Sequence, residues 1–326
     1  MSKKFLAAVA GVVLAVGLAG CGGDSAASGG GGAGNDTITM GFAQVGAESG
    51  WRTANTKSVQ ESAKEAGIDL KFSDGQQKQE NQIKAIRSYI QQKVDVIAFS
   101  PVVETGWDAV LLEAKRANIP VILTDRAVDS EDTSLYKTFL GSDFVAEGKK
   151  AGEWLVEESQ GKSEVNVVEL QGTTGAAPAI DRKQGFADAT KAAPQIKVIA
   201  SQTGDFTRSG GKQVMEAFLK SNPKIDVVYA HNDDMGLGAI EAIEAAGKKP
   251  GVDIKIITVD AVHDGVQALA DGKINYIVEC NPLLGPQLMD LAKKVVKGEQ
   301  VPQRVVTEET TFTQEQAKTE LPNRKY

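Results

Sequence analysis

Short apolar runs alternate with stretches of helical periodicity along most of the chain. Each run is rich in β-branched or aromatic residues and ends in polar ones. In the first half the runs lie at 38–44, 69–75, 95–101 and 119–126. In the second half they lie at 165–171, 197–204, 226–232 and 254–260. Near-continuous apolar strands that alternate with helices predict parallel sheets covered by helices on both faces.

The spacing of these runs repeats. Their starts are 31, 26 and 24 residues apart in the first half and 32, 29 and 28 residues apart in the second. This repetition predicts two copies of one doubly wound, Rossmann-like α/β lobe. Further strands are expected at 138–142, where the chain crosses to the second lobe, and at 275–280, where it crosses back. The lobes are therefore expected to share a hinge of several strands.

Helical periodicity is clearest between the apolar runs. Residues 54–66 precede Gly67, a typical helix-ending residue, and 82–91 carry isoleucines at helical spacing. Helices are also expected at 233–246 and 285–297. The predicted first lobe comprises residues 36–141 and 281–308, and the predicted second lobe comprises residues 142–280 and 309–326.

The first residues have the pattern of an export signal. Lys3 and Lys4 precede an apolar stretch, 5–19, that is short for a membrane span and leads into Leu18-Ala19-Gly20-Cys21. Small residues directly before a cysteine resemble the lipobox of bacterial lipoproteins, so residues 1–20 are interpreted as a lipoprotein signal peptide and Cys21 as the lipidated residue. The Gly/Ser-rich segment 21–35 is expected to be a flexible tether. The body is thus predicted to be exported and held at the extracytoplasmic face of the cell membrane.

Charge and motif content exclude several classes of function. The formal net charge is −7, and it becomes −9 without Lys3 and Lys4, which argues against a nucleic-acid partner. Cys280 has no partner for an intrachain disulfide once Cys21 is lipidated, and His231 and His263 show no metal-ligand spacing. Phosphate-binding, dinucleotide and serine-nucleophile motifs are absent from the sequence, so neither a cofactor nor catalysis is expected. A monomer is expected.

Polar residues stand at the carboxyl ends of the predicted strands. Ligands of open parallel sheets bind at this edge. The candidates at strand ends are Gln44, Asp74, Ser100, Asp125, Arg126, Gln171, Asn232, Asp233 and Asp260. Further candidates close to this edge are Trp51, Arg52, Arg182 and Phe206. The adjacent acids Asp233 and Asp234 open a predicted helix and are expected to cap it and favour its dipole.

This set of side chains suits a neutral polyol. Carboxylate and guanidinium groups form charge-assisted, often bidentate hydrogen bonds to hydroxyls. Amides offer a donor together with an acceptor, and aromatic rings cover the C–H face of a sugar. Because both signs of charge are present, a neutral sugar is favoured over an anion.

Several strings resemble the pentose and hexose branch of the type I periplasmic binding proteins. They are QVGAESGWR at 44–52, DGQQKQENQIKAIR at 74–87, PVVETGW at 101–107, DRKQGF at 181–186, GDFTR at 204–208 and YAHNDDM at 229–235. The resemblance extends from about residue 36 to the C-terminus and is fullest to members that bind galactofuranose. It implies a protein that captures a monosaccharide between two lobes and delivers it to an ABC permease.

The resemblance also implies roles for single residues. Asp125 and Arg126 would bind hydroxyls from the first lobe, and a second set, Arg182, Asn232 and Asp260, from the second lobe. Trp51 and Phe206 would form aromatic walls. Arg52 replaces an aromatic residue of ribose-binding relatives, and Cys280 replaces a hinge glutamine. These departures argue against ribose and favour a galactofuranose-type ligand.

Three other functions are weighed against import. A transcription regulator of the lac-repressor type would need an N-terminal helix-turn-helix, where this chain has a lipobox. A secreted sugar-modifying enzyme would need a nucleotide motif or a poised pair of acids, and neither is evident. A sensor that presents its sugar-bound form to a chemoreceptor or histidine kinase is not separable from an importer by sequence.

Overall fold

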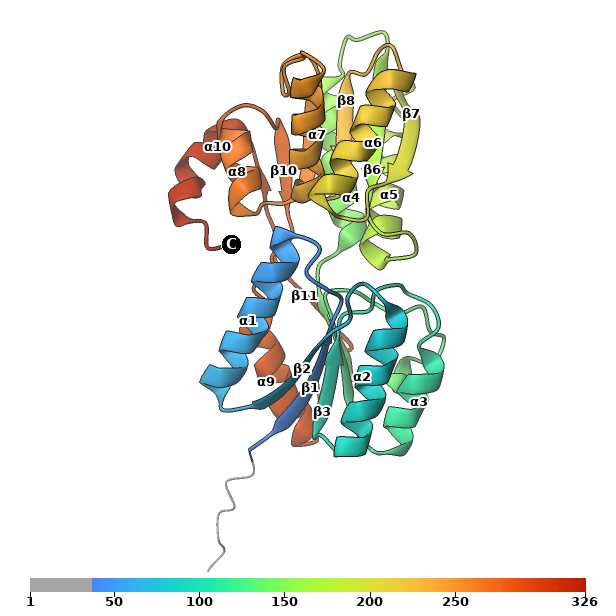
Figure 1. The fold of residues 1–326 in the computed structure, drawn as a ribbon, viewed down its shortest axis with the longest axis vertical. Coiled ribbons are helices and arrows are strands. Elements are labelled where there is room, and N and C mark those ends of the chain that lie inside the picture. Colours follow the sequence, from blue (N-terminus) through green and yellow to red (C-terminus); the bar gives the residue numbers. More distant parts are fainter. Residues whose placement is uncertain (1–36) are drawn as a thin grey trace, which may run out of the picture. The chain divides into compact units, whose positions relative to one another are not determined.

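Two parallel sheets carry the fold (Figure 1). The structure is a computed structural model and describes residues 37–326; the predicted signal peptide, Cys21 and the tether to residue 35 lie outside the described residues. Both sheets are six-stranded, and the same strand order is used twice. The predicted fold class of two doubly wound lobes is therefore confirmed.

The first sheet has the order β11-β5-β4-β3-β1-β2. Its strands pair in parallel, with Met40 of β1 opposite Val96 of β3 and Leu70 of β2. The strands are β1 (Thr39–Gln44), β2 (Asp69–Asp74), β3 (Val96–Phe99), β4 (Val121–Thr124), β5 (Thr138–Gly141) and β11 (Arg304–Val306). The helices beside this sheet are α1 (Gly50–Ala66), α2 (Gln79–Gln92), α3 (Asp108–Arg116) and α9 (Gly285–Val296). We call this body the first lobe.

The second sheet has the order β12-β10-β9-β8-β6-β7, in which only β12 runs antiparallel to its neighbour. Its strands are β6 (Val165–Gln171), β7 (Ile196–Thr203), β8 (Val227–Ala230), β9 (Lys255–Asp260), β10 (Tyr276–Glu279) and β12 (Thr311–Phe312). The helices are α4 (Phe144–Glu158), α5 (Ala177–Thr190), α6 (Arg208–Ser221), α7 (Asp233–Ala245), α8 (His263–Ala270) and α10 (Gln314–Glu320). We call this body the second lobe. Short 3-10 turns follow β4 and α10, at Thr133–Leu135 and Leu321–Asn323.

Alternate strand residues form a separate core on each face of each sheet. In β1, Met40 and Phe42 face α1 and α9, whereas Ala43 packs toward α2 and α3. In β6, Val165 and Val167 join the core with α4 and α5, and Val168 joins the core with α6 and α7. Burial on both faces explains why the central strands read as continuous apolar runs.

The strands expected to cross between the lobes lie inside the sheets instead. β5 is hydrogen-bonded between β4 and β11, and β10 lies between β9 and β12. The chain passes from one sheet to the other after β5, after β10 and after β11. The lobe boundaries proposed from the sequence, near residues 141, 280 and 308, stay a prediction.

A carboxylate connects the three crossing segments. One oxygen of Glu309, Oε1, accepts hydrogen bonds from Ser142 Oγ (2.5 Å), Asn281 N (3.0 Å) and Thr307 Oγ1 (2.9 Å). Glu147 and Cys280 place ligand-type atoms within 4.8 Å of this carboxylate, a cluster that sequence spacing did not show. Because this oxygen of Glu309 accepts from donors in all three segments, the cluster is a contact between the segments of the hinge.

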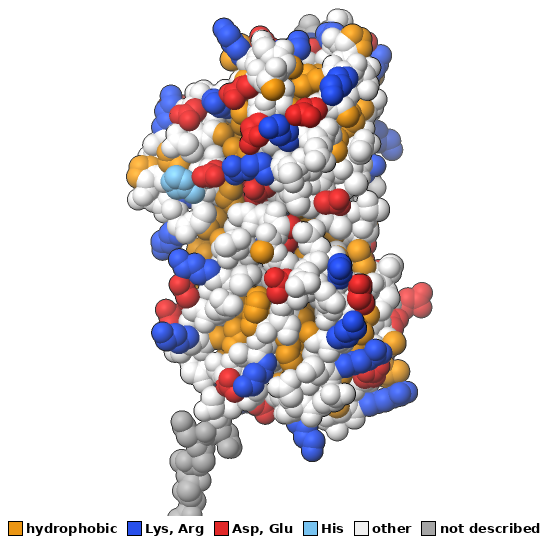
Figure 2. All heavy atoms as spheres, viewed as in Figure 1, with side chains coloured by type: hydrophobic (Ala, Val, Ile, Leu, Met, Phe, Trp, Pro, Cys, Tyr) orange, Lys and Arg blue, Asp and Glu red, His pale blue; other side chains and the backbone are white. Residues whose placement is uncertain are grey.

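The surface carries charges of both signs. Figure 2 shows Lys and Arg side chains interspersed with Asp and Glu on the face in view. Among residues 37–326, none of the helices is both long enough and apolar enough to cross a membrane.

Candidate functional site

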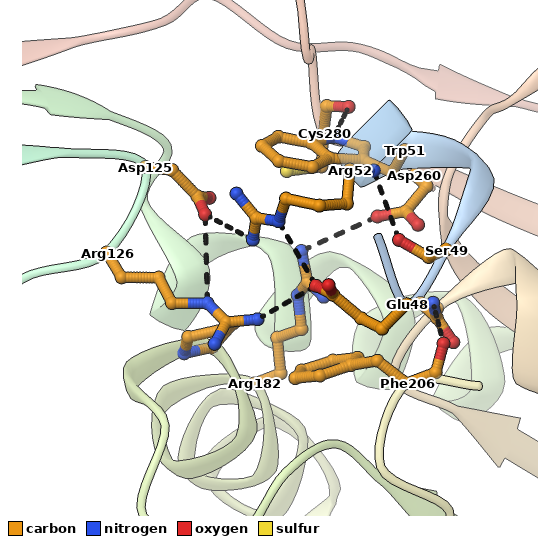
Figure 3. Close-up of a pocket in the computed structure, with 12 residues that line it drawn as sticks. Glu48, Ser49, Trp51, Arg52, Asp125, Arg126, Arg182, Phe206, Asp260 and Cys280 are labelled. Atoms are coloured by element: carbon orange, nitrogen blue, oxygen red, sulfur yellow. Dashed lines mark hydrogen bonds and ion pairs between the residues drawn. The ribbon is translucent and has the colours of Figure 1, made fainter. Parts of the chain in front are cut away.

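A small cavity lies where the strand ends of the two lobes meet (Figure 3). The lining residues are Glu48, Ser49, Trp51, Arg52, Asp125, Arg126, Pro178, Arg182, Phe206, Asn232, Asp260 and Cys280. The structure thus brings eight of the candidates to one cavity, whereas Gln44, Asp74, Ser100, Gln171 and Asp233 do not line it.

Arg52 organises the first-lobe side of the cavity. Its Nη2 donates to Asp125 Oδ2 at 2.7 Å, its Nε donates to Glu48 Oε1 at 3.1 Å, and its Nη1 donates to Gln44 Oε1 at 3.2 Å. Ser100 Oγ also donates to Asp125 Oδ2, at 2.9 Å. Burial opposes the charge on Arg52, but Asp125 and Glu48 outweigh that effect and raise its pKa. Gln44 therefore supports Arg52 from beneath and does not face the cavity.

Arg126 has unused hydrogen-bonding capacity. Its Nη1 donates to the carbonyl oxygen of Val102 at 3.1 Å, and Nη2 lies 3.7 Å from Glu48 Oε1. The buried Arg126 Nε and the buried Glu48 Oε2 have no hydrogen-bond partner among the described residues. Burial, followed by the charge of Arg52, lowers the pKa of Arg126 to about 10, so the guanidinium stays charged at neutral pH. An unpaired buried donor and acceptor at one cavity are the groups that a bound hydroxyl satisfies.

Arg182 organises the second-lobe side. From α5 its Nε donates to Glu147 Oε2 at 2.7 Å and its Nη1 donates to the carbonyl oxygen of His231 at 2.6 Å. Its Nη2 lies 3.8 Å from Asp260 Oδ1. Burial opposes the charge on Arg182, but Glu147 and the other nearby acids raise its pKa. One guanidinium thus faces two buried carboxyls, and burial raises the pKa of Glu147 to about 8 and that of Asp260 well above its usual value.

We expect the free energy of unfolding to fall as the pH rises from 5 to 8. Both carboxyls are protonated in either state below about pH 4, so they contribute nothing there. Above that pH the unfolded chain releases protons that the folded chain keeps. Each such proton lowers the free energy of unfolding by at most about 1.4 kcal/mol per pH unit. Urea unfolding across this range should therefore slope downward, and Asp260→Asn should flatten the slope. An unchanged slope in that variant would contradict this assignment.

Aromatic rings close two sides of the cavity. Trp51 Nε1 donates to the carbonyl oxygen of Cys280 at 2.7 Å, which fixes the indole beside the crossing after β10. The Phe206 ring lies on the opposite side, with the Arg126 guanidinium 5.3 Å from its centroid (Figure 3). Gly172 makes room for this ring, since a Cβ there would lie 1.9 Å from Phe206 Cζ. The Arg52 guanidinium lies 4.7 Å from the centroid of the Trp51 ring, so each of the two rings has an arginine against it.

Three residues that line the cavity have an uncommon backbone conformation. Asp125, Phe206 and Asp260 have positive φ values of 63°, 61° and 124°. Such conformations are uncommon for residues with a side chain, cost on the order of 1–3 kcal/mol each, and gather at ligand-binding sites. The strain is consistent with selection of these positions for binding.

Some candidates have other partners. Asp74 is exposed and accepts from the backbone of Gln76, and Gln171 donates to Glu169 and Ser201. Neither lines the cavity. Asn232 both lines it and caps α7, because its Oδ1 accepts from Met235 N at 3.0 Å.

The expectation that Asp233 and Asp234 cap their own helix was wrong. Asp233 accepts instead from Thr258 Oγ1 and Val262 N within the second lobe. Asp234 accepts from Gly50 N of the first lobe. Asn232, which precedes both acids, is the capping residue.

Sequence reasoning missed Glu48, Ser49 and Pro178, and it placed Cys280 at the hinge without assigning it to the cavity. Glu48 and Ser49 lie in the loop directly after β1, and Cys280 directly follows β10. The strand-end rule, extended by a few residues into each loop and applied to the hinge strand, would have included these three. Pro178 lies in the first turn of α5 and has no comparable signal.

Comparisons with known proteins agree with this geometry. Residues 40–300 match the family described as "Periplasmic binding protein domain". The galactofuranose-binding protein YtfQ of Escherichia coli (strain K12) is 52% identical over 292 residues, which cover 88% of this chain and 92% of the relative.

Solved structures give the same result. A protein from Mycobacterium smegmatis in complex with β-D-fucofuranose is 70% identical, with a TM-score of 0.88 over 89% of this chain and 96% of that one. The periplasmic binding protein component of the arabinose ABC transporter from Shewanella sp. ANA-3, bound to α- and β-L-arabinofuranose, is 50% identical, with a TM-score of 0.85 over 88% and 96%. The resemblance inferred from the sequence is confirmed, and the chain belongs to the periplasmic binding protein family.

Proposed function

We propose that the chain is an extracytoplasmic binding protein that captures one neutral monosaccharide for an ABC importer. The observation that carries this proposal is a cavity between the two lobes, lined by Trp51 and Phe206, at which the buried Arg126 Nε and Glu48 Oε2 have no hydrogen-bond partner among the described residues. Sugar hydroxyls both donate and accept, so they satisfy groups of both kinds.

The charges that line the cavity favour a neutral ligand. The lining holds three acidic side chains, Glu48, Asp125 and Asp260, and three arginines, Arg52, Arg126 and Arg182, so groups of both kinds are present in equal number. An anion or a cation would leave one set without compensation, and a buried uncompensated charge is costly. The relatives described above bind galactofuranose, fucofuranose and arabinofuranose, and this supports an aldose in its five-membered ring form.

The anchored location is part of the proposal. It rests on the lipobox-like sequence before Cys21 and on the Gly/Ser-rich segment to residue 35. We propose that lipidation holds the binding lobes beside the permease and that the sugar is released unchanged.

A thermal-shift panel tests the ligand class. D-galactose, D-fucose and L-arabinose, each offered as its equilibrium mixture of ring forms, should raise the melting temperature. A ligand at a hundredfold excess over its dissociation constant stabilises the native form by about 2.7 kcal/mol. Amino acids, nucleotides and polyamines should have no effect. A response to an amino acid alone would refute the sugar assignment.

A further inference from the structure

The first N–H group of α1 has its partner on the other lobe. Ser49 caps α1, and its Oγ accepts from Arg52 N at 3.1 Å while its carbonyl oxygen accepts from Thr53 N. The first turn of the helix contains no acidic residue. Gly50 N donates instead to Asp234 Oδ2 of the second lobe, at 2.8 Å.

Asp234 has a hydrogen-bond partner on the first lobe, whereas the preceding residue, Asp233, does not. Both carboxylate oxygens of Asp233 accept from second-lobe groups, Thr258 Oγ1 and Val262 N. Asp234 is 8% exposed, and its other contact is an ion pair in which Arg208 Nε lies 3.6 Å from Oδ1. A carboxylate of the second lobe thus supplies the negative charge that the positive end of a first-lobe helix favours.

We propose that Asp234 and Gly50 N form a latch that holds the two lobes closed. This inference rests on the proposed function and adds a positioning residue to it, because Asp234 does not line the cavity. The two groups belong to different lobes, so rotation about the crossing segments separates them and exposes both to water. A contact made only in the closed form lowers the free energy of that form and slows release of the sugar.

Each half of the latch can be removed separately. Asp234→Ala removes the acceptor. Gly50→Pro removes the donor, and proline is well tolerated at the first position of a helix. Its ring Cδ replaces the amide hydrogen that points at Asp234 Oδ2, so in the closed form this variant also adds a steric contact with Asp234. The preceding residue, Ser49, is already extended, with φ −146° and ψ 164°, as a residue before proline must be. A Cβ at Gly50 would meet nothing closer than Asp234 Oδ2 at 3.5 Å.

Stopped-flow fluorescence of the tryptophans with D-galactose as the probe separates the two rate constants. We expect each variant to release the sugar about tenfold faster while its association rate stays within about twofold of the wild type. The double variant should release the sugar no faster than Asp234→Ala alone, because both changes remove the same contact and the alanine leaves room for the proline ring. Asp264→Asn is the matched control, since Asp264 also contacts Arg208 (3.1 Å) but belongs wholly to the second lobe. Wild-type release rates in both single variants would overturn the proposal.

A second readout does not depend on sugar binding. Spin labels at Lys84→Cys on α2 and Gln213→Cys on α6, both exposed positions, report the separation of the lobes. The latch variants should have a smaller closed fraction than the unvaried chain without sugar, and an equal fraction would refute the latch. Failure of every sugar to bind the wild type would instead refute the proposed function.

Discussion

Replacing Arg126 with alanine should weaken sugar binding on the order of a hundredfold and leave the fold intact. The variant removes a buried cation whose Nε lies 3.7 Å from Asp125 Oδ2 and has no hydrogen-bond partner among the described residues. It also leaves the carboxylate of Glu48 with less compensation, because Arg126 Nη2 lies 3.7 Å from Glu48 Oε1. Losing one member of such a buried set costs on the order of 2–5 kcal/mol of binding free energy.

Calorimetric titration with D-galactose measures this effect. Arg126→Lys keeps the charge but lacks the planar fork, so it should bind with intermediate affinity. Arg116→Ala, an exposed arginine at the end of α3 in the same lobe, is the matched control and should bind like the wild type. Equal affinities in Arg126→Ala and the control would remove Arg126 from the site.

Gly148→Ala should destabilise the protein by about 3 kcal/mol and weaken sugar binding as well. α4 and α5 approach so closely that a Cβ on Gly148 would lie 2.1 Å from the carbonyl oxygen of Arg182. The contact is reciprocal, since a Cβ on Gly185 would lie 2.0 Å from the carbonyl oxygen of Val145. Alanine favours a helix by only about 1 kcal/mol over glycine, which is less than the cost of forcing two packed backbones apart.

Binding should suffer in this variant because α5 carries Arg182 into the cavity. Urea denaturation gives the loss of unfolding free energy, and titration of the folded fraction gives the affinity. Glu153→Ala, on the exposed side of the same helix, removes only a surface ion pair with Lys149 and should change stability by less than about 0.5 kcal/mol. If Gly148→Ala is as stable as this control, the close approach of α4 and α5 does not exclude a Cβ at Gly148.

The strand pattern predicted most of the fold because buried parallel strands have a distinctive composition. Every predicted apolar run became a strand of one of the two sheets, including the edge strand β7, where Val198 and Ile199 remain partly exposed. The short strands β11 and β12 were not predicted. Strands of two or three residues leave no periodicity, and they form because neighbouring strands offer them hydrogen bonds.

The site residues that the sequence predicted correctly are those that one structural rule identifies one at a time. Asp125, Arg126, Asn232 and Asp260 follow strand ends, and the fold places strand ends together. Pairings between distant elements left no trace in the sequence. The contact of Arg182 with Glu147 depends on how α4 and α5 pack.

The latch illustrates the same limit. The sequence predicts that Asp234 caps its own helix, α7. In the structure its carboxylate accepts a hydrogen bond from the first N–H group of α1 in the other lobe. Its partner is a backbone N–H of another element, and a backbone group carries no sequence signature.

A crystal structure of the chain grown with D-galactose shows whether a monosaccharide occupies the cavity between the two lobes. We expect one sugar ring between Trp51 and Phe206, with hydroxyls hydrogen-bonded to Arg126 and Glu48. A sugar bound elsewhere, or an empty cavity at a concentration that saturates binding in solution, would contradict it.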